Sequence, residues 1–132
     1  CAEYFIRQLS SDQVPAWDFD ASEESQKQKD SSAEAIAAAG MFELADVLAA
    51  DRGKQDTSAR SLRTYGMLLL DALCRDTYLA RQDPSWEGIL KHGVYHIHKK
   101  LGVNESVMWG EFFFCDALQR ALIQLEQGFT PG

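Results

Sequence analysis

The segment from Ala33 to Ala50 reads AEAIAAAGMFELADVLAA, and this alanine-rich, periodically apolar sequence constrains the fold more than any other feature. Alanine has the highest intrinsic helix propensity of the amino acids. Gly40 lies in the middle of the segment, where glycine costs about 1 kcal/mol relative to alanine, and we expect another backbone to approach closely there. The segment therefore predicts an inner helix of a multi-helix assembly.

Local signals mark both ends of this helix. The side-chain oxygens of Asp30–Ser32 can cap its first amides, and Glu34 in the first turn favours the positive end of the helix dipole. Gly53 follows Asp51 and Arg52, in the position where a left-handed terminating residue is favoured. We expect the helix to run between these signals.

Three further helices and no strand are expected in the rest of the chain. Apolar residues at helical spacing predict helices at Cys1–Leu9 and Ser58–Ala80. A last helix is expected to be capped by Asn104 or Ser106 and to end at Gly128. The fold class is therefore all-α.

Two long connections, Asp12–Asp30 and Gly93–Asn104, each lead into an apolar helix. The first carries the polar stretch SEESQKQKD, and residues 86–92 before the second predict a short helix or turn. The connection at 51–57 is short. If the helices alternate in direction, both long connections lie at the same end of the assembly, which makes that end the candidate site face.

The overall charge excludes some kinds of partner. Twenty acidic against 13 basic side chains give a formal charge of −7, which disfavours nucleic acid as a partner. No apolar stretch reaches the roughly 18 to 20 residues needed to cross a bilayer, so we expect no membrane partner. Cys1, Cys74 and Cys115 are widely spaced, and this predicts buried free thiols rather than a disulfide framework.

Three blocks, in this order along the chain, resemble the unsaturated glucuronyl hydrolases of glycoside hydrolase family 88. They are VPAWDFDA at 14–21, KDSSAEAIAAAG at 29–40 and GVNESVMWGEFFF at 102–114. The resemblance covers essentially all of residues 1–132, but only about the last third of a typical family member. It implies that the chain is the C-terminal part of one (α/α)6-barrel catalytic domain, in which inner-helix amino termini converge on a pocket.

The resemblance also implies a reaction. Water adds across the 4,5 double bond of an unsaturated uronic acid at the non-reducing end of a lyase-generated, glycosaminoglycan-type oligosaccharide. The family uses aspartates as general acid and base, on helices that precede the blocks seen here, and no metal or organic cofactor. We therefore expect no catalytic residue in this chain, which would be inactive alone, and a bacterial enzyme of the cytoplasm or periplasm.

Trp17 and Asp18 are the first candidate substrate-binding residues. A Trp face can stack on a pyranose ring, and a carboxylate accepts hydrogen bonds from sugar hydroxyls. The structural alternative is that Trp17 and Phe19 anchor the loop while Asp18 and Asp20 bind backbone amides. A hydrolytic pair formed by Asp18 and Asp20 is disfavoured. Two carboxylates at this spacing on an extended loop more often have a structural role.

The second long connection supplies the candidates His96, His98 and Lys99. Together with His92, Tyr95 and Lys100 they form the chain's one basic concentration, which could hold the carboxylate or sulfates of a lyase product. The alternatives are a solvated charge run, or a metal site formed by His92, His96, His98 and Glu105. The loose spacing disfavours the metal site.

Trp109 is the last candidate substrate-binding residue, at the start of the final helix. Gly110 beside it permits close approach, and the Trp ring offers a stacking surface. The alternative is core packing between helices, and core packing is the clear expectation for Phe112–Phe114.

Two other functions stay open from the sequence. One is an unsaturated rhamnogalacturonyl hydrolase of the same fold, which would differ in its pocket loops. The other is a non-enzymatic helical interaction module that is complete as it stands, whose apolar faces should then close on themselves.

Overall fold

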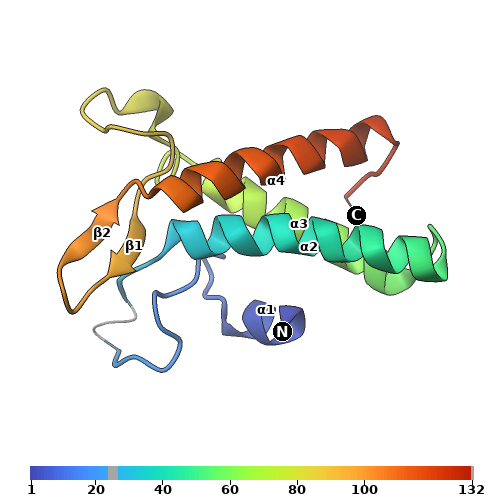
Figure 1. Ribbon diagram of the computed structural model, residues 1–132, viewed down its shortest axis with the longest axis horizontal. Coiled ribbons are helices and arrows are strands. Elements are labelled where there is room, and N and C mark those ends of the chain that lie inside the picture. Colours follow the sequence, from blue (N-terminus) through green and yellow to red (C-terminus); the bar gives the residue numbers. More distant parts are fainter. Residues whose placement is uncertain (24–26, 132) are drawn as a thin grey trace.

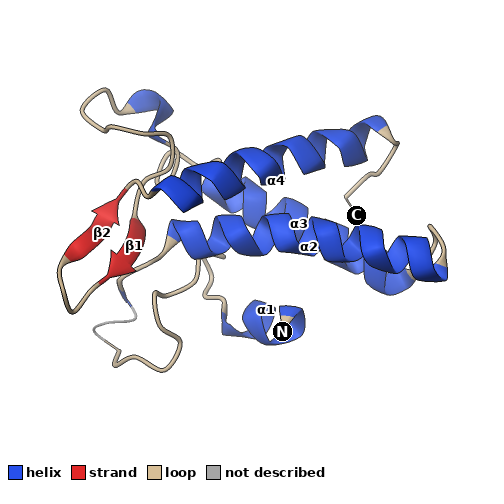
Figure 2. Cartoon of the chain, in the orientation of Figure 1, coloured by secondary structure: helices blue, strands red, loops and turns tan. Residues whose placement is uncertain are grey.

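The computed structural model describes residues 1–23 and 27–131; residues 24–26, part of the polar stretch in the first long connection, lie outside that description. The chain is mostly helical, with one small sheet (Figures 1 and 2). Its elements are α1 (Ala2–Gln8), α2 (Ser31–Arg52), α3 (Thr57–Leu73), η2 (Ala80–Gln82), β1 (Gly93–His96), β2 (Leu101–Glu105) and α4 (Met108–Glu126). No helix among the described residues is long and apolar enough to span a membrane.

Helix α2 is the centre of the packing, as its sequence predicts. It packs along both α3 and α4 (Figure 1). The core between them is made of small and large apolar side chains, including Ala35, Ala38, Phe42, Leu69, Leu73, Phe114 and Ala117. Phe42 is fully buried against Gly66 of α3, where an added Cβ would lie 3.0 Å from the Phe42 ring. This is where two helices need a glycine.

Gly40 does not have the role expected of it. Nothing in the described structure lies within 4 Å of a Cβ built at Gly40, and the residue is exposed. The close approaches along this core occur instead at Gly66 and at Gly110, where an added Cβ would lie 2.9 Å from Ser32 Cβ. The presence of Gly40 in α2 did not show which face of that helix packs against its neighbours.

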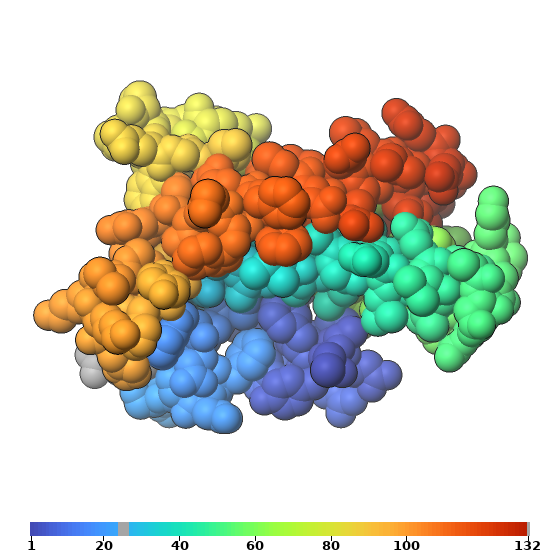
Figure 3. All heavy atoms as spheres, in the orientation of Figure 1, coloured from blue at the N-terminus to red at the C-terminus, as the bar shows by residue number. Residues whose placement is uncertain are grey.

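Both long connections lie at one end of the helices, as expected from their alternation. Figure 3 shows the first connection against the second, next to the amino-terminal ends of α2 and α4. Lys29 closes the base of the first connection: its Nζ donates to Asp12 Oδ1 at 3.0 Å, to Val14 O at 2.9 Å and to Ser10 Oγ. The two ends of this long loop are thereby tied together.

Helix α3 is shorter than predicted. It ends at Leu73 rather than Ala80, because turns at 74–78 lead the chain to Leu79, which pairs with a later segment. Leu79 pairs with Leu90, and Lys91 N donates to Tyr78 O at 2.6 Å. These long-range backbone bonds compete with continuation of the helix.

The second connection contains a β-hairpin, so the expectation of no strand was wrong. Strands β1 and β2 are antiparallel, with Val94 opposite Val103 and His96 opposite Leu101. The turn at 97–100 closes with a bond from Lys100 N to Ile97 O at 2.9 Å. Four- and five-residue strands without an Asn-Gly or Asp-Gly turn give only a weak pattern.

The expected side-chain caps of α4 are also absent. Val107 is the N-cap residue and has no side-chain cap bond. Asn104 Oδ1 instead bonds His92 Nδ1, and Ser106 Oγ donates to Leu90 O at 2.7 Å. The polar residues before α4 therefore hold the preceding loop rather than the helix end.

Asp30 is the N-cap of α2, as predicted, and also anchors the hairpin. Its Oδ1 accepts from Ser32 N at 3.0 Å, from Ser32 Oγ at 2.6 Å and from Val94 N at 3.1 Å. Ser32 Oγ in turn accepts from Trp109 Nε1 at 3.1 Å. One buried carboxylate thus joins the start of α2 to the hairpin, and through Ser32 to α4.

Glu34 does not act as a charge at the helix dipole. Its side chain is fully buried, and neither carboxyl oxygen has a hydrogen-bond partner in the described structure. Burial, with a smaller contribution from the charge of Asp12, raises the pKa of Glu34 to about 9 against the opposing effect of Lys29. The group is therefore protonated and neutral at pH 7.

Part of the apolar pattern of α4 faces solvent. Phe112 was expected in the core but is 64% exposed, whereas Phe114 is buried as expected. Cys1 and Cys115 are exposed rather than buried, and Cys74 is half-buried; the three cysteines are free, as expected. The exposed positions lie on the side of α4 away from α2.

Replacing Gly110 by Ala is expected to destabilise the chain by about 1–3 kcal/mol, because the new methyl group overlaps Ser32 and Val107 at the crossing of α2 and α4. Gly40→Ala is the matched control, since it meets open space within a helix and should stabilise by about 0.5–1 kcal/mol. Urea denaturation of both variants measures the difference. Equal effects would show that the α2–α4 contact is not as close as described.

Asp30→Ala is expected to lower the free energy of unfolding by about 1 kcal/mol for the lost cap and about 1–3 kcal/mol for the buried Val94 amide left unpaired. Hydrogen exchange of the Val94 amide should become faster. Asp56→Ala is the control, because Asp56 caps α3 through Ala59 N at 2.9 Å, on a helix that is remote in sequence from the hairpin. Unchanged Val94 exchange in Asp30→Ala would contradict the anchoring role.

The stability of the wild-type chain is expected to fall as pH rises from about 5 to about 9. In this window the folded state keeps the proton on Glu34, whose pKa is raised to about 9, while the unfolded state, in which the pKa returns to its ordinary value of 4.5, releases it. Glu34→Gln should remove that decline, and Glu3→Gln on the exposed surface of α1 should keep it. Urea titrations across the window measure the slopes, and an unchanged slope in Glu34→Gln would refute the assignment.

Candidate functional site

Five aromatic and imidazole rings form a continuous row at the end where the two connections meet. Trp17 contacts His98 with ring centroids 5.5 Å apart, and His98 lies 6.1 Å from His96. His96 lies 6.3 Å from Tyr95, and Tyr95 lies 5.5 Å from Trp109. We call these five residues the aromatic wall. Neighbouring rings meet at steep angles, so edges and faces alternate along it.

Three separate segments build the aromatic wall. Trp17 comes from the first connection, where its backbone N–H donates to Gln28 O at 2.9 Å. Tyr95 and His96 come from β1, and His98 from the turn that follows it. Trp109 comes from the first turn of α4, and its indole N–H is fixed by Ser32. The Asp30 and Ser32 bonds hold the hairpin and the start of α4 to α2, so the positions of Tyr95, His96 and Trp109 depend on them.

Trp109 fits the packing alternative in part, and its contact with a ligand stays a prediction. Its indole nitrogen is bound within the α2–α4 contact, while 36% of the residue stays accessible. Gly110 beside it is buried and makes the close approach to α2 possible. Helix packing thus holds the ring in place at the surface.

Two cations lie next to the wall in the chain, and one imidazole nitrogen of the wall has no hydrogen-bond partner among the described residues. Lys99 and Lys100 are exposed in the hairpin turn, and in the described part of the chain neither has a carboxylate within ion-pair distance. The Nδ1 atom of His96 is buried without a partner there. Cations and imidazoles next to aromatic faces suit a ligand that has both ring surfaces and acidic groups.

The Asp18 and Phe19 pair fits the structural alternative in part. Asp18 Oδ1 accepts from Asp20 N at 2.9 Å in a local turn, and both carboxylates are at least partly exposed. Phe19 packs on Tyr4 and Phe5 of α1, at 6.0 and 5.8 Å between ring centroids, and so anchors the loop. Asp18 stays next to Trp17 in the chain, and its contact with a ligand remains a prediction.

His92 lies outside the aromatic wall. Its ring packs against Tyr78 and Trp86, with centroid distances of 5.9 and 5.4 Å, and bonds Asn104. Within the described residues, no group of three or more His, Cys, Asp or Glu side chains is arranged to hold a metal ion. The metal set of His92, His96, His98 and Glu105 does not come together.

Sequence reasoning left Tyr95 out of the candidate substrate-binding residues, yet Tyr95 links the hairpin rings to Trp109. Its role depends on the strand, because only extended backbone places it between the two neighbours. In a strand, Val94 and His96 point to one face and Tyr95 points to the other. This alternation was the available signal for the position of Tyr95. Asp30 and Ser32 were identified as caps, but their long-range bonds could not be read from the sequence.

Comparison with known proteins gives the chain a family context, although no family model matches it. It is 32% identical over 129 residues to the unsaturated glucuronyl hydrolase of Bacillus sp. (strain GL1), which covers 98% of this chain and 32% of that protein. It is 33% identical over 117 residues to the unsaturated chondroitin disaccharide hydrolase of Streptococcus pyogenes serotype M1, covering 89% of this chain and 28% of the relative.

Solved structures agree with the sequence comparison. The crystal structure of the unsaturated glucuronyl hydrolase from Bacillus sp. GL1, described as responsible for the degradation of glycosaminoglycan, superposes with a TM-score of 0.76 at 31% identity, covering 96% of this chain and 31% of that chain. The Streptococcus agalactiae enzyme superposes with a TM-score of 0.74 at 29% identity, covering 89% and 30%. An unsaturated glucuronyl hydrolase specific for heparin shares the fold, with a TM-score of 0.76 at 22% identity.

These matches place the helices and the hairpin in the (α/α)6-barrel architecture as part of a barrel. The chain spans about a third of the length of the relatives that it matches. By sequence and by fold, over most of its length, the chain is similar to part of the unsaturated glucuronyl hydrolases.

Proposed function

We propose that residues 1–132 are the C-terminal part of an (α/α)6-barrel enzyme that removes 4,5-unsaturated uronic acid from the non-reducing end of oligosaccharides made by polysaccharide lyases. The acid and base aspartates belong to the preceding part of the barrel, so this chain supplies substrate-binding residues and no catalytic one. The proposal includes no metal or organic cofactor. A bacterial enzyme of the cytoplasm or periplasm fits the bacterial relatives.

The proposed reaction is a hydration. Water adds across the C4=C5 bond, with its hydroxyl oxygen bonding to C5 and a proton going to C4. The product is a hemiketal at C5, which opens and releases the rest of the saccharide. The substrate keeps its C5 carboxylate throughout, so a site for it needs cations and donors as well as a surface for the sugar ring.

The aromatic wall is the observation that carries this proposal. It offers ring surfaces at Trp17 and Trp109 and donors at His96 and His98, with the unpaired cation Lys99 next to His98 in the chain. A ring face of Trp17 suits the apolar side of a sugar, and Lys99 suits a carboxylate or sulfate. Asp18 beside Trp17 can accept from a sugar hydroxyl.

The exposed apolar residues favour part of a larger barrel over a complete interaction module. On α2, Ile36, Leu44 and Val47 are 41, 41 and 59% exposed, and they lie on one face of the helix. On α4, Met108 and Phe112 are 82 and 64% exposed. Apolar faces of a complete module would close on themselves, whereas further helix pairs of a barrel would cover these.

The substrate class can be narrowed by the relatives. Two of them are named for chondroitin disaccharides or for glycosaminoglycan degradation, which favours a glycosaminoglycan-derived product over a pectin-derived one. The test is to assay a longer protein that carries this chain on unsaturated chondroitin and rhamnogalacturonan disaccharides, following the loss of ultraviolet absorbance of the conjugated double bond. Consumption of neither substrate would refute the proposed activity.

In that longer protein, Trp17→Ala is expected to raise KM about tenfold, equivalent to about 1.4 kcal/mol, while kcat changes less. The reason is that ring stacking binds substrate and transition state alike. Lys99→Gln should raise KM more for a sulfated than for an unsulfated disaccharide. Steady-state kinetics on both substrates measures these changes.

Arg7→Gln is the control for Lys99→Gln. Arg7 is an exposed cation on α1, paired only with Glu3 in the described structure, and its loss should leave KM unchanged. If Trp17→Ala and Lys99→Gln both keep the parent KM in an active enzyme, the aromatic wall does not bind substrate, although the activity would stand.

A further inference from the structure

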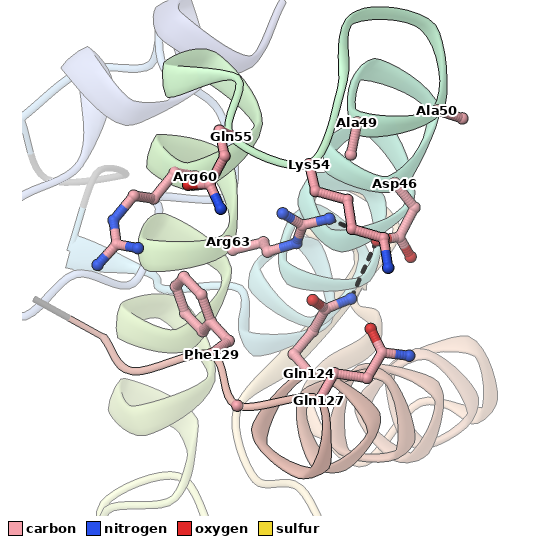
Figure 4. Close-up of a pocket in the computed structure, with 11 residues that line it drawn as sticks. Asp46, Ala49, Ala50, Lys54, Gln55, Arg60, Arg63, Gln124, Gln127 and Phe129 are labelled. Atoms are coloured by element: carbon pink, nitrogen blue, oxygen red, sulfur yellow. Dashed lines mark hydrogen bonds and ion pairs between the residues drawn. The ribbon is translucent and has the colours of Figure 1, made fainter.

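A polar cleft lies at the end of the long helices opposite the hairpin (Figures 1 and 4). The C-terminal ends of α2 and α4, the start of α3 and the chain after α4 enclose a volume of about 570 Å³. Its lining includes Asp46, Lys54, Arg60, Arg63, Gln124 and Phe129. Three separate helices contribute, so the cleft is formed only by the folded chain.

The cleft is positively charged within an acidic protein. The lining contains three cations, Lys54, Arg60 and Arg63, and one carboxylate, Asp46, in a chain whose formal charge is −7. That carboxylate is already occupied, because Asp46 Oδ1 accepts from Arg63 at 3.1 Å and from Gln124 Nε2 at 3.0 Å (Figure 4). An excess of positive charge is left over.

The remaining cations lack acidic partners. Among the described residues Lys54 has no ion pair, and Arg60 contacts only Thr130 O at 3.5 Å and the Phe129 ring, whose centroid is 5.7 Å away. The side chain of Arg63 is only 13% exposed, and its Nε is buried without a partner there. A buried donor without an acceptor costs about 1–3 kcal/mol, which an oxygen atom of a ligand would relieve.

We propose that this cleft binds a small molecule through an oxyanion, which can be a carboxylate, a sulfate or a phosphate group. Lys54 and Arg60 supply the charge, and Arg63 supplies the buried N–H donor. Guanidinium groups suit such oxyanions because they present several donors in one plane. The volume accommodates a ligand the size of an acidic sugar rather than a bare ion alone.

A purely structural role would involve only part of this arrangement. The Arg63, Asp46 and Gln124 bonds tie α2, α3 and α4 together and would explain why those three residues are polar. Lys54 and Arg60 take no part in these bonds. They are exposed and can be changed without breaking the tie, so they separate the two explanations.

The test measures binding of sodium sulfate, sodium phosphate and sodium glucuronate to the longer protein that carries this chain, by calorimetry at constant ionic strength. We expect saturable binding of one ligand per chain, with the tightest of the three identifying the oxyanion. In Lys54→Gln/Arg60→Gln, affinity should fall about tenfold or more, since each charge-assisted contact contributes substantially. Backbone amide shifts of Gln55, Gln127 and Phe129 should move on binding to the wild-type chain.

Arg7→Gln/Arg75→Gln is the matched control, because it removes two exposed cations from surface ion pairs elsewhere and changes the net charge equally. Its affinity should equal that of the wild type. Absence of saturable binding, equal weakening in both double variants, or amide shifts confined to residues outside the cleft would each overturn the proposal. The outcome is independent of the aromatic wall, since no residue is shared.

Discussion

The carboxylate of Asp30 is the interaction on which the rest of this structure depends. One oxygen caps α2 through Ser32 and holds β1 through the Val94 amide. Ser32 then receives the indole N–H of Trp109, at the point where Gly110 lets α4 approach α2. A helix start, a hairpin and a second helix start thus converge on one buried polar group. Burying a carboxylate is unfavourable unless its hydrogen bonds are formed. Here the hydrogen bonds of Asp30 hold together the end of the molecule that carries the aromatic wall.

The helical framework could be predicted because it depends on local sequence patterns. The alanine-rich α2, its cap at Asp30 and its end at Gly53 follow from propensity and terminal signals, and the placement of both long connections follows from helix alternation. The length of α3 could not be predicted, because the pairing of Leu79 with Leu90 is a long-range contact. For the same reason the hairpin was missed: its strands are too short for their alternation to outweigh the polar turn between them.

The candidate site was predictable as a set of residue types but not as an arrangement. Trp17, His96, His98 and Trp109 were chosen for their chemistry, and the structure places them in one row. That the row needs Tyr95 to be continuous, and that His92 belongs to a different cluster, depends on strand register and on packing against Tyr78. Gly40 shows the same limit, since a glycine in a helix indicates a close approach but does not say from which side.

The aromatic wall has a consequence for how the fold responds to a ligand. Its rings come from a loop at Trp17, a hairpin at 95–98 and a helix start at Trp109, which are far apart in sequence. A molecule that touches all three can bind only while they are assembled. Its binding free energy is therefore added to the stability of the assembled end, in proportion to the logarithm of its concentration. Such a molecule would act as a reversible cross-link between the loop at Trp17 and the two segments that Asp30 and Ser32 already hold to α2.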